Sequence, residues 1–135
     1  MPVTRRHSRR HLLLPVAFLS AMLTGCGKNL DTLAVEAMDA CIAARNPLFT
    51  SGRGAQALDT PLPPAAEETA MRLRYPRASA KFQAIAESAA DQVTLVCALD
   101  IISRWKNDEA RTFVARYAQH PDAAVATAAE RLTAR

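Results

Sequence analysis

Roughly the last sixty residues carry four apolar stripes at helical spacing, and this pattern limits the possible fold more than any other feature of the chain. Within each stripe, apolar side chains recur at the three- and four-residue intervals of an amphipathic helix. The stripes are Phe82, Ile85, Ala86 and Ala89; Leu95, Ala98, Leu99, Ile102 and Trp105; Ala110, Phe113, Val114, Tyr117 and Ala118; and Val125, Ala128, Ala129 and Leu132. Short polar connectors separate them, with the sequences ADQ, KNDE and HPDA. We therefore expect an all-α fold in which short helices pack as antiparallel neighbours.

The composition agrees with a helical domain. Half of the 135 residues are hydrophobic, which is enough for one packed core, and only 5% are aromatic. Alanine dominates the second half of the chain, and alanine is the residue that helices accept at the lowest free-energy cost. It offers little to a β-sheet, where branched and aromatic side chains are preferred.

The helical pattern also repeats along the chain. The second stripe aligns with the fourth at a spacing of 30, Asp100 falls on Glu130 at the same spacing, and Phe82 and Phe113 are 31 apart. The stretch 92–132 resembles the HEAT-like repeats of bacterial proteins in its DEA helix start, its HPD turn and its VxxAAxxL helix. The resemblance implies a fragment of an α-solenoid. A small helical bundle or a tetratricopeptide-like array would give the same pattern, and the family fixes no functional residues.

Turn-forming residues divide the rest of the chain. We expect a single helical domain over 26–135, with an anchor-proximal helix over 26–45, a loop over 46–63 and the helical repeats over 64–135. Asn29 is suited to cap the first helix, because its side chain can accept from the free backbone amides of the first turn. The predicted loop is rich in glycine, proline and other turn formers, which interrupt helices.

The N-terminus has the three-part layout of a secretory signal peptide. Residues 1–11 are basic, and about a dozen apolar residues follow, fewer than the roughly 20 that a membrane-spanning helix needs. The segment ends in Leu23-Thr24-Gly25-Cys26, which resembles the lipobox of bacterial lipoproteins: leucine, two small residues, then cysteine. The resemblance implies that a signal peptidase recognises Leu23, Thr24 and Gly25 and removes residues 1–25. It also implies that the thiol of Cys26 carries a diacylglycerol. The alternative is an ordinary signal peptide that contains a cysteine.

Two neighbouring features bear on the export route and on the destination. Residues 8–13 resemble a twin-arginine export signal, although a general secretory signal with additional arginines fits them as well. Position 27 is glycine, whereas many lipoproteins retained in the inner membrane have aspartate after the lipidated cysteine. This resemblance implies a lipoprotein of the outer membrane that faces the periplasm.

The two remaining cysteines, Cys41 and Cys97, would lie in a compartment where disulfides form. A bridge between them closes a loop of 57 residues, counting both cysteines. Two buried free thiols are the alternative, because cysteine also packs as a small hydrophobic residue. Cys97 lies on the helix face opposite Leu99 and Ile102, so the predicted helix over 91–105 is apolar on two sides. Such a helix is expected to be internal, and the first helix could cover its second face.

The charge of the chain does not indicate nucleic-acid binding. The formal net charge is +4, but four of the 17 Lys and Arg residues lie in the signal segment, which leaves 13 against 13 Asp and Glu. A formally neutral domain has no electrostatic basis for binding the phosphate backbone.

Catalytic and metal-binding patterns are also missing from the sequence. After residue 25 the chain has a single histidine, His120, and neither a CxxC pair nor a glycine-rich phosphate loop. We therefore expect no cofactor, no metal site and no enzymatic activity.

The sequence favours a binding or scaffolding module that a covalent lipid holds at the membrane and that acts through contacts with a protein partner. One alternative is a small periplasmic enzyme inhibitor or immunity-type lipoprotein, which a protruding loop between Asn46 and Pro64 would favour. Another is an envelope-maintenance lipoprotein without a discrete ligand.

Overall fold

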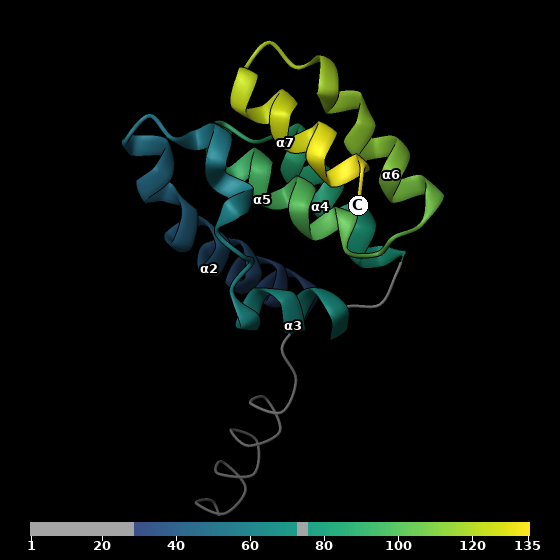
Figure 1. Ribbon diagram of the computed structural model, residues 1–135. Helices are drawn as coiled ribbons and strands as arrows, with labels where there is room; N and C mark the ends of the chain where they lie inside the picture. The colour runs from purple at the N-terminus through teal and green to yellow at the C-terminus, as the bar shows by residue number, and fades with distance from the viewer. Residues whose placement is uncertain (1–28, 73–75) are drawn as a thin grey trace, which may run out of the picture.

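Figure 1 shows the computed structural model of the protein, which describes residues 29–72 and 76–135. Over these residues the chain forms six α-helices and two short 3₁₀ helices, with no strand. They are α2 (Leu30–Thr50), η1 (Gly54–Asp59), α3 (Pro64–Arg72), α4 (Arg77–Glu87), α5 (Gln92–Ser103), α6 (Asp108–Ala115), η2 (Arg116–Gln119) and α7 (Ala123–Thr133). The prediction of an all-α fold is confirmed, and the helices form a small bundle.

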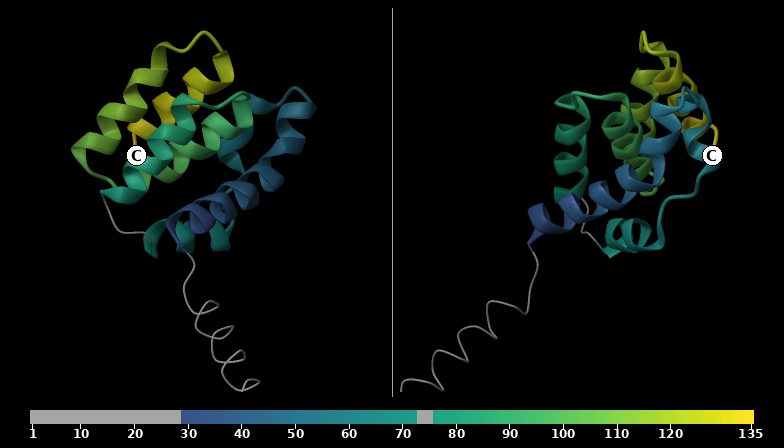
Figure 2. Two further views of the ribbon diagram at one scale, coloured as in Figure 1. Left: turned by 180° about the vertical axis from the view of Figure 1, so that it is seen from behind. Right: turned by 90° about the vertical axis from the view of Figure 1, so that its left-hand side faces the viewer.

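The bundle is built around α5. Every residue from Leu95 to Ile102 is buried, and α2, α4, α6 and α7 all pack against this helix. The start of α2 and α3 lie together at one end of the molecule, while α6 and α7 lie at the other (Figures 1 and 2). The prediction that the helix over 91–105 is internal is therefore confirmed, and α2 supplies the cover over its second face.

Asparagine and aspartate side chains begin four of the helices. Asn29, Asp91, Asn107 and Asp122 each accept a hydrogen bond from a backbone amide three residues further on, over 2.8–3.1 Å. These bonds satisfy amide groups that the first turn of a helix leaves without partners. The predicted cap at Asn29 is confirmed. At α6 the cap is Asn107, and Asp108 and Glu109 follow it in the first turn of the helix.

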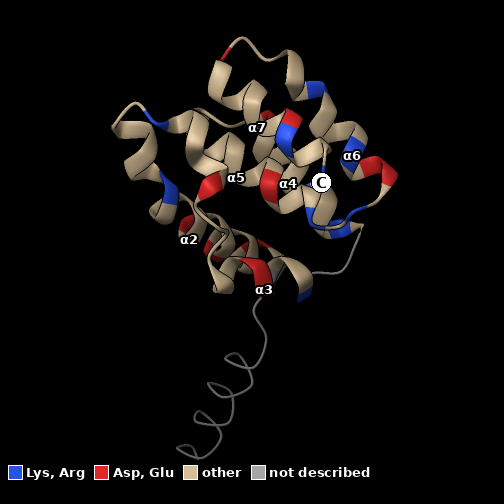
Figure 3. Cartoon of the chain, in the orientation of Figure 1, with Lys and Arg blue, Asp and Glu red and all other residues tan. Residues whose placement is uncertain are grey.

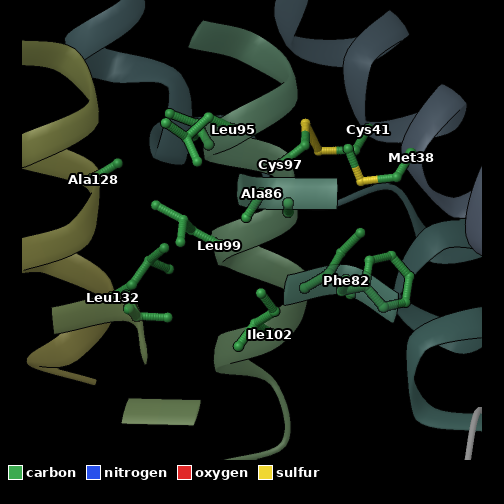
Figure 4. Packing of buried hydrophobic residues seen from close by; sticks show 14 of the residues in the cluster. Met38, Cys41, Phe82, Ala86, Leu95, Cys97, Leu99, Ile102, Ala128 and Leu132 are labelled. Atoms are coloured by element: carbon green, nitrogen blue, oxygen red, sulfur yellow. A yellow bond between two sulfur atoms is a disulfide. The ribbon is translucent and has the colours of Figure 1, made fainter. Parts of the chain in front are cut away.

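The predicted stripes form the core. All eight apolar positions that align at the spacing of 30, which are Leu95, Ala98, Leu99, Ile102, Val125, Ala128, Ala129 and Leu132, are buried. Figure 4 shows residues of α5 and α7 meeting at this seam. Two aromatic pairs add to the packing elsewhere: the rings of Phe82 and Trp105 lie 5.8 Å apart, and those of Phe113 and Tyr117 lie 5.5 Å apart. Residues that align in the repeat therefore occupy buried positions in both α5 and α7. The HEAT-like resemblance stays a prediction.

The predicted boundary between the first helix and the loop is wrong, whereas the predicted end of the loop at residue 63 agrees with the start of α3 at Pro64. The helix predicted over 26–45 begins at Leu30 within the described residues and continues to Thr50, with Pro47 inside its last turn. The segment predicted as a loop over 46–63 therefore contains the end of α2 and the 3₁₀ helix η1. Gly52 follows α2 in a left-handed conformation, with φ +77°, which glycine adopts without strain.

Candidate functional site

The four lipobox positions, Leu23, Thr24, Gly25 and Cys26, lie outside the described residues. The first described helix, α2, begins at Leu30. Three residues separate that position from Cys26. If the chain between them were fully extended, the Cα atoms of Cys26 and Leu30 would lie about 14 Å apart, which is the largest separation it allows. A lipid on Cys26 would therefore hold the domain close to the membrane surface.

Cys41 of α2 and Cys97 of α5 are joined by a disulfide in the structure, with Cα atoms 5.9 Å apart. Both residues are fully buried, and Figure 4 shows the bridge next to Met38 and Phe82 in the core. The bridge ties the first helix of the domain to its central helix. It thus links the first described helix to the buried centre of the bundle.

One turn beyond the disulfide on each helix, Arg45 and Asp100 form an ion pair in the core. Nη2 of Arg45 lies 2.6 Å from Oδ2 of Asp100, and the two side chains are 1% and 0% exposed. The same Nη2 donates to the carbonyl oxygen of Thr60, and Nη1 donates to the sulfur of Cys41. Nε of Arg45 has no hydrogen-bond partner among the described residues. Burying two charges is tolerated here because each one meets the other directly.

Asp100 also connects the core to the surface. Its second oxygen, Oδ1, accepts from Nε of Arg104 over 3.3 Å and lies 3.8 Å from Nη1 of Arg135. Nη1 of Arg104 in turn donates to Glu67 over 3.0 Å. A single buried carboxylate therefore serves three arginines, and two of these reach the outside of the bundle.

The two outer arginines stand at a cavity of about 160 Å³ between the end of α5, the start of α6 and the end of α7. Four cationic side chains line it, those of Arg104, Lys106, Arg111 and Arg135. Val114 and Leu132 supply apolar lining, and three small polar residues complete the wall. Figure 3 shows Lys and Arg gathered along the α5–α6 connection and α6, close to the end of the chain. This cavity and the charged cluster behind it form the candidate site.

The sequence analysis did not predict this site. It identified Asp100 only as a repeat position aligned with Glu130, and it assigned no role to Arg45, Arg104, Lys106 or Arg135. A signal for part of it was present, because a carboxylate in the middle of an apolar helix needs a buried counter-charge. The buried face of α2, which includes Met38 and Cys41, continues to Arg45 at helical spacing, so that arginine is the natural candidate.

The phenol of Tyr117 in η2 is partly buried. Burial raises its pKa above the usual value of 10.0, the nearby Arg116 lowers that pKa, and Glu87 raises it. The ring of Tyr117 packs against those of Phe113 and His120.

Two further features concern residues 29–72 and 76–135, namely metal sites and membrane-spanning helices. No group of three or more histidine, cysteine or acidic side chains in these ranges could hold a metal ion. Nor do the described helices include one with the length and apolar character that crossing a bilayer requires.

Comparison of the chain with protein-family models, with curated proteins and with solved structures found no match.

Proposed function

We propose that the protein is a lipoprotein of the cell envelope whose helical domain faces the periplasm and acts as a binding or scaffolding module for a protein partner, without catalysing a reaction. The observation that carries the proposal is the short interval between Cys26 and the start of α2 at Leu30. An anchored domain with so short a connection would meet partners only within a thin layer above the membrane. Two or more acyl chains would make such an anchor stable.

The architecture supports a module that presents a fixed surface. The disulfide between Cys41 and Cys97 and the Arg45–Asp100 pair fasten α2 to α5 at adjacent turns. The helices α4, α6 and α7 pack against α5, and α3 packs against α2. A surface held in this way loses little conformational entropy on binding, which favours affinity for a partner.

The inhibitor or immunity-type alternative has less support. A protruding loop between Asn46 and Pro64 would favour it, because such a loop could enter the active site of a target enzyme. In the structure this segment packs onto the bundle, with Ala57, Leu58 and Leu62 buried. The ring of Phe49 lies so close to Gly54 that a Cβ there would come within 2.7 Å of it. The segment is therefore part of the core framework.

The anchor is tested by replacing the lipidated residue. Cys26→Ala should abolish labelling with radioactive palmitate and release the protein from the membrane fraction, because only a thiol can form the thioether. Thr24→Ala, which keeps a small residue in the recognition motif, is the matched control and should be labelled normally. Continued labelling and membrane fractionation of Cys26→Ala would show that the lipobox interpretation is wrong.

The binding role needs a separate experiment. Crosslinking in intact envelopes should trap the wild-type protein with a specific partner at its normal expression level, and Cys26→Ala should reduce the yield of that product. Recovery of the monomer alone, from a protein shown to be labelled and membrane-bound, would contradict the binding role and leave the anchor intact.

A further inference from the structure

The cavity between α5, α6 and α7 has an excess of positive charge. Arg104 is paired with Asp100 and Glu67, and Arg135 shares the same aspartate at 3.8 Å. Asp100 is already the direct counter-ion of the buried Arg45, however, so it cannot neutralise the outer arginines fully. Nη2 of Arg104 has no partner among the described residues. The result is a field that favours an anion in the cavity.

The other two cations of the cavity are the more available ones. Nη1 of Arg111 lies 3.6 Å from Asp108, with both side chains well exposed to water, so this pair is weak. Lys106 forms no ion pair with any residue in the described ranges. Five cationic side chains around the site, counting Arg45, thus face three acidic ones, Asp100, Glu67 and Asp108.

Lys106 is held in an unusual backbone conformation. It follows α5 with φ +50°, in the left-handed region, and is the one non-glycine residue of the described chain found there. Glycine is the usual residue at this position after a helix, because a Cβ carries a steric cost in that region. The chain instead places a long cationic side chain at the rim of the cavity. Strain of this kind is often found at functional sites.

The remaining lining restricts the ligand further. Val114 and Leu132, 1% and 4% exposed, present apolar surface inside the cationic rim. The side-chain oxygen of Asn107 is used in capping α6, which leaves its amide group as a possible donor toward the cavity. A volume of about 160 Å³ suits a small group and not an extended polymer.

From these features we propose that the cavity binds a small organic oxyanion, a carboxylate or a phosphate monoester that carries a short apolar chain. The anionic head lies between Lys106, Arg104 and Arg111, whose N–H groups donate to its oxygens. The apolar chain lies against Val114 and Leu132. This inference does not depend on the lipid anchor or on the protein partner proposed above.

The test uses the mature protein, exported through its own signal and purified in a non-ionic detergent, with ionic strength held constant by sodium chloride. Titration with pentanoate, butyl phosphate, acetate and inorganic phosphate is followed by the backbone amide shifts of the ¹⁵N-labelled protein. Comparison of pentanoate with butyl phosphate shows whether the cavity prefers a carboxylate or a phosphate monoester. Pentanamide, which has nearly the same shape without the charge, is the matched control ligand.

At least one of the two alkyl anions should shift amide signals at the α5–α6 connection and the end of α7, and pentanamide should not. Each methylene that reaches the apolar lining should tighten binding by about fourfold, so pentanoate should bind more tightly than acetate. At a ligand concentration ten times its Kd, the melting temperature should rise by about 6 °C.

Lys106→Gly is the decisive variant. It removes the cation and relieves the backbone strain, so the folded protein should keep or increase its melting temperature while its affinity for the anion falls at least fivefold. Arg111→Ala should weaken binding in the same way. Arg53→Ala, which removes an equal charge from the exposed turn after α2, should bind like the wild type. Equal binding of pentanamide, full affinity in folded Lys106→Gly, or no shifts at the cavity with any of the anions would overturn the proposal.

Discussion

Arg45 and Asp100 are the residues on which the interior of the molecule most depends. Each is buried and each is the other's closest counter-charge. A pair of this kind contributes little net stability, because the cost of removing two ions from water offsets most of their attraction. Its value lies in selecting one arrangement of α2 against α5, since a shift along either helix would leave two buried charges unpaired. The pair therefore specifies the register of the two helices.

The first prediction concerns this pair. Asp100→Leu should lower the free energy of unfolding by about 3–5 kcal/mol, because it leaves Arg45 buried without a counter-charge. Arg45→Met should lower it by less, because Asp100 keeps Arg104 at 3.3 Å and Arg135 at 3.8 Å. The double variant should recover most of that loss, since it replaces both charges with apolar side chains. Urea denaturation of the oxidised proteins measures the three values. The coupling would be contradicted if Asp100→Leu were within about 1 kcal/mol of the wild type. It would also be contradicted if the double variant lost as much stability as the two single variants together.

At this scale the sequence predicted the cap at Asn29 and the pair of cysteines better than the charges. Asn29 could be identified as a cap because capping is a local interaction within one turn of chain. Arg45 and Asp100 are 55 residues apart, and nothing local specifies their contact. The left-handed Lys106 is equally hidden, because that conformation is expected of glycine or asparagine and not of lysine.

Among the elements, α2 shows most clearly where local patterns mislead. Pro47 and the glycines after it predict a break near residue 46, yet the helix continues to Thr50. Proline lacks the N–H that would donate to the residue four positions earlier, so it weakens the ladder at one point. In compensation, the last turn is closed by hydrogen bonds from the amides of Ser51 and Arg53 to Pro47 and Leu48. Packing of Phe49 against Gly54 is a tertiary contact that the sequence pattern does not encode.

The helices from α4 to α7 were predicted more accurately, because their stripes, caps and short connectors are all local signals. Here the second prediction applies. Ala128, 4% exposed, is on the inner stripe of α7, so Ala128→Asp should lower the free energy of unfolding by about 3–5 kcal/mol through a buried, unpaired charge. Ala123→Asp, at the exposed start of the same helix, is the control. There the new carboxylate faces water and the positive end of the helix dipole, so stability should be unchanged or slightly higher.

Circular dichroism and urea denaturation of both α7 variants provide the measurement. Equal stability of the two proteins would mean that α7 does not pack through Ala128. A larger loss for Ala123→Asp would indicate that the helix begins elsewhere.

For the molecule as a whole, an all-α domain and its internal helix were predictable, whereas most of the contacts between the helices were not. Composition, periodicity and capping specify helices without specifying which of them touch. The cavity illustrates the limit, because it forms where the ends of α5, α6 and α7 meet. None of its cations is exceptional in the sequence. The disulfide is the one long-range contact that the sequence itself suggested, through the even number of cysteines left after Cys26.

That disulfide gives the last prediction, which tests topology and compartment together. Protein exported through its own signal should show no free thiol at Cys41 or Cys97 when it is alkylated under denaturing conditions and analysed by mass spectrometry. Protein made without residues 1–25 in a reducing cytoplasm should carry both thiols.

Closing a loop of 57 residues stabilises a domain by about 4 kcal/mol in the chain-entropy estimate. Reduction of the exported protein should therefore lower its melting temperature by about 10 °C or more, and Cys41→Ala/Cys97→Ala should melt near the reduced wild type. Two alkylated thiols in the exported protein would contradict the bridge. The packing of α2 against α5 and the ion pair one turn away would then hold the two helices together without a covalent link.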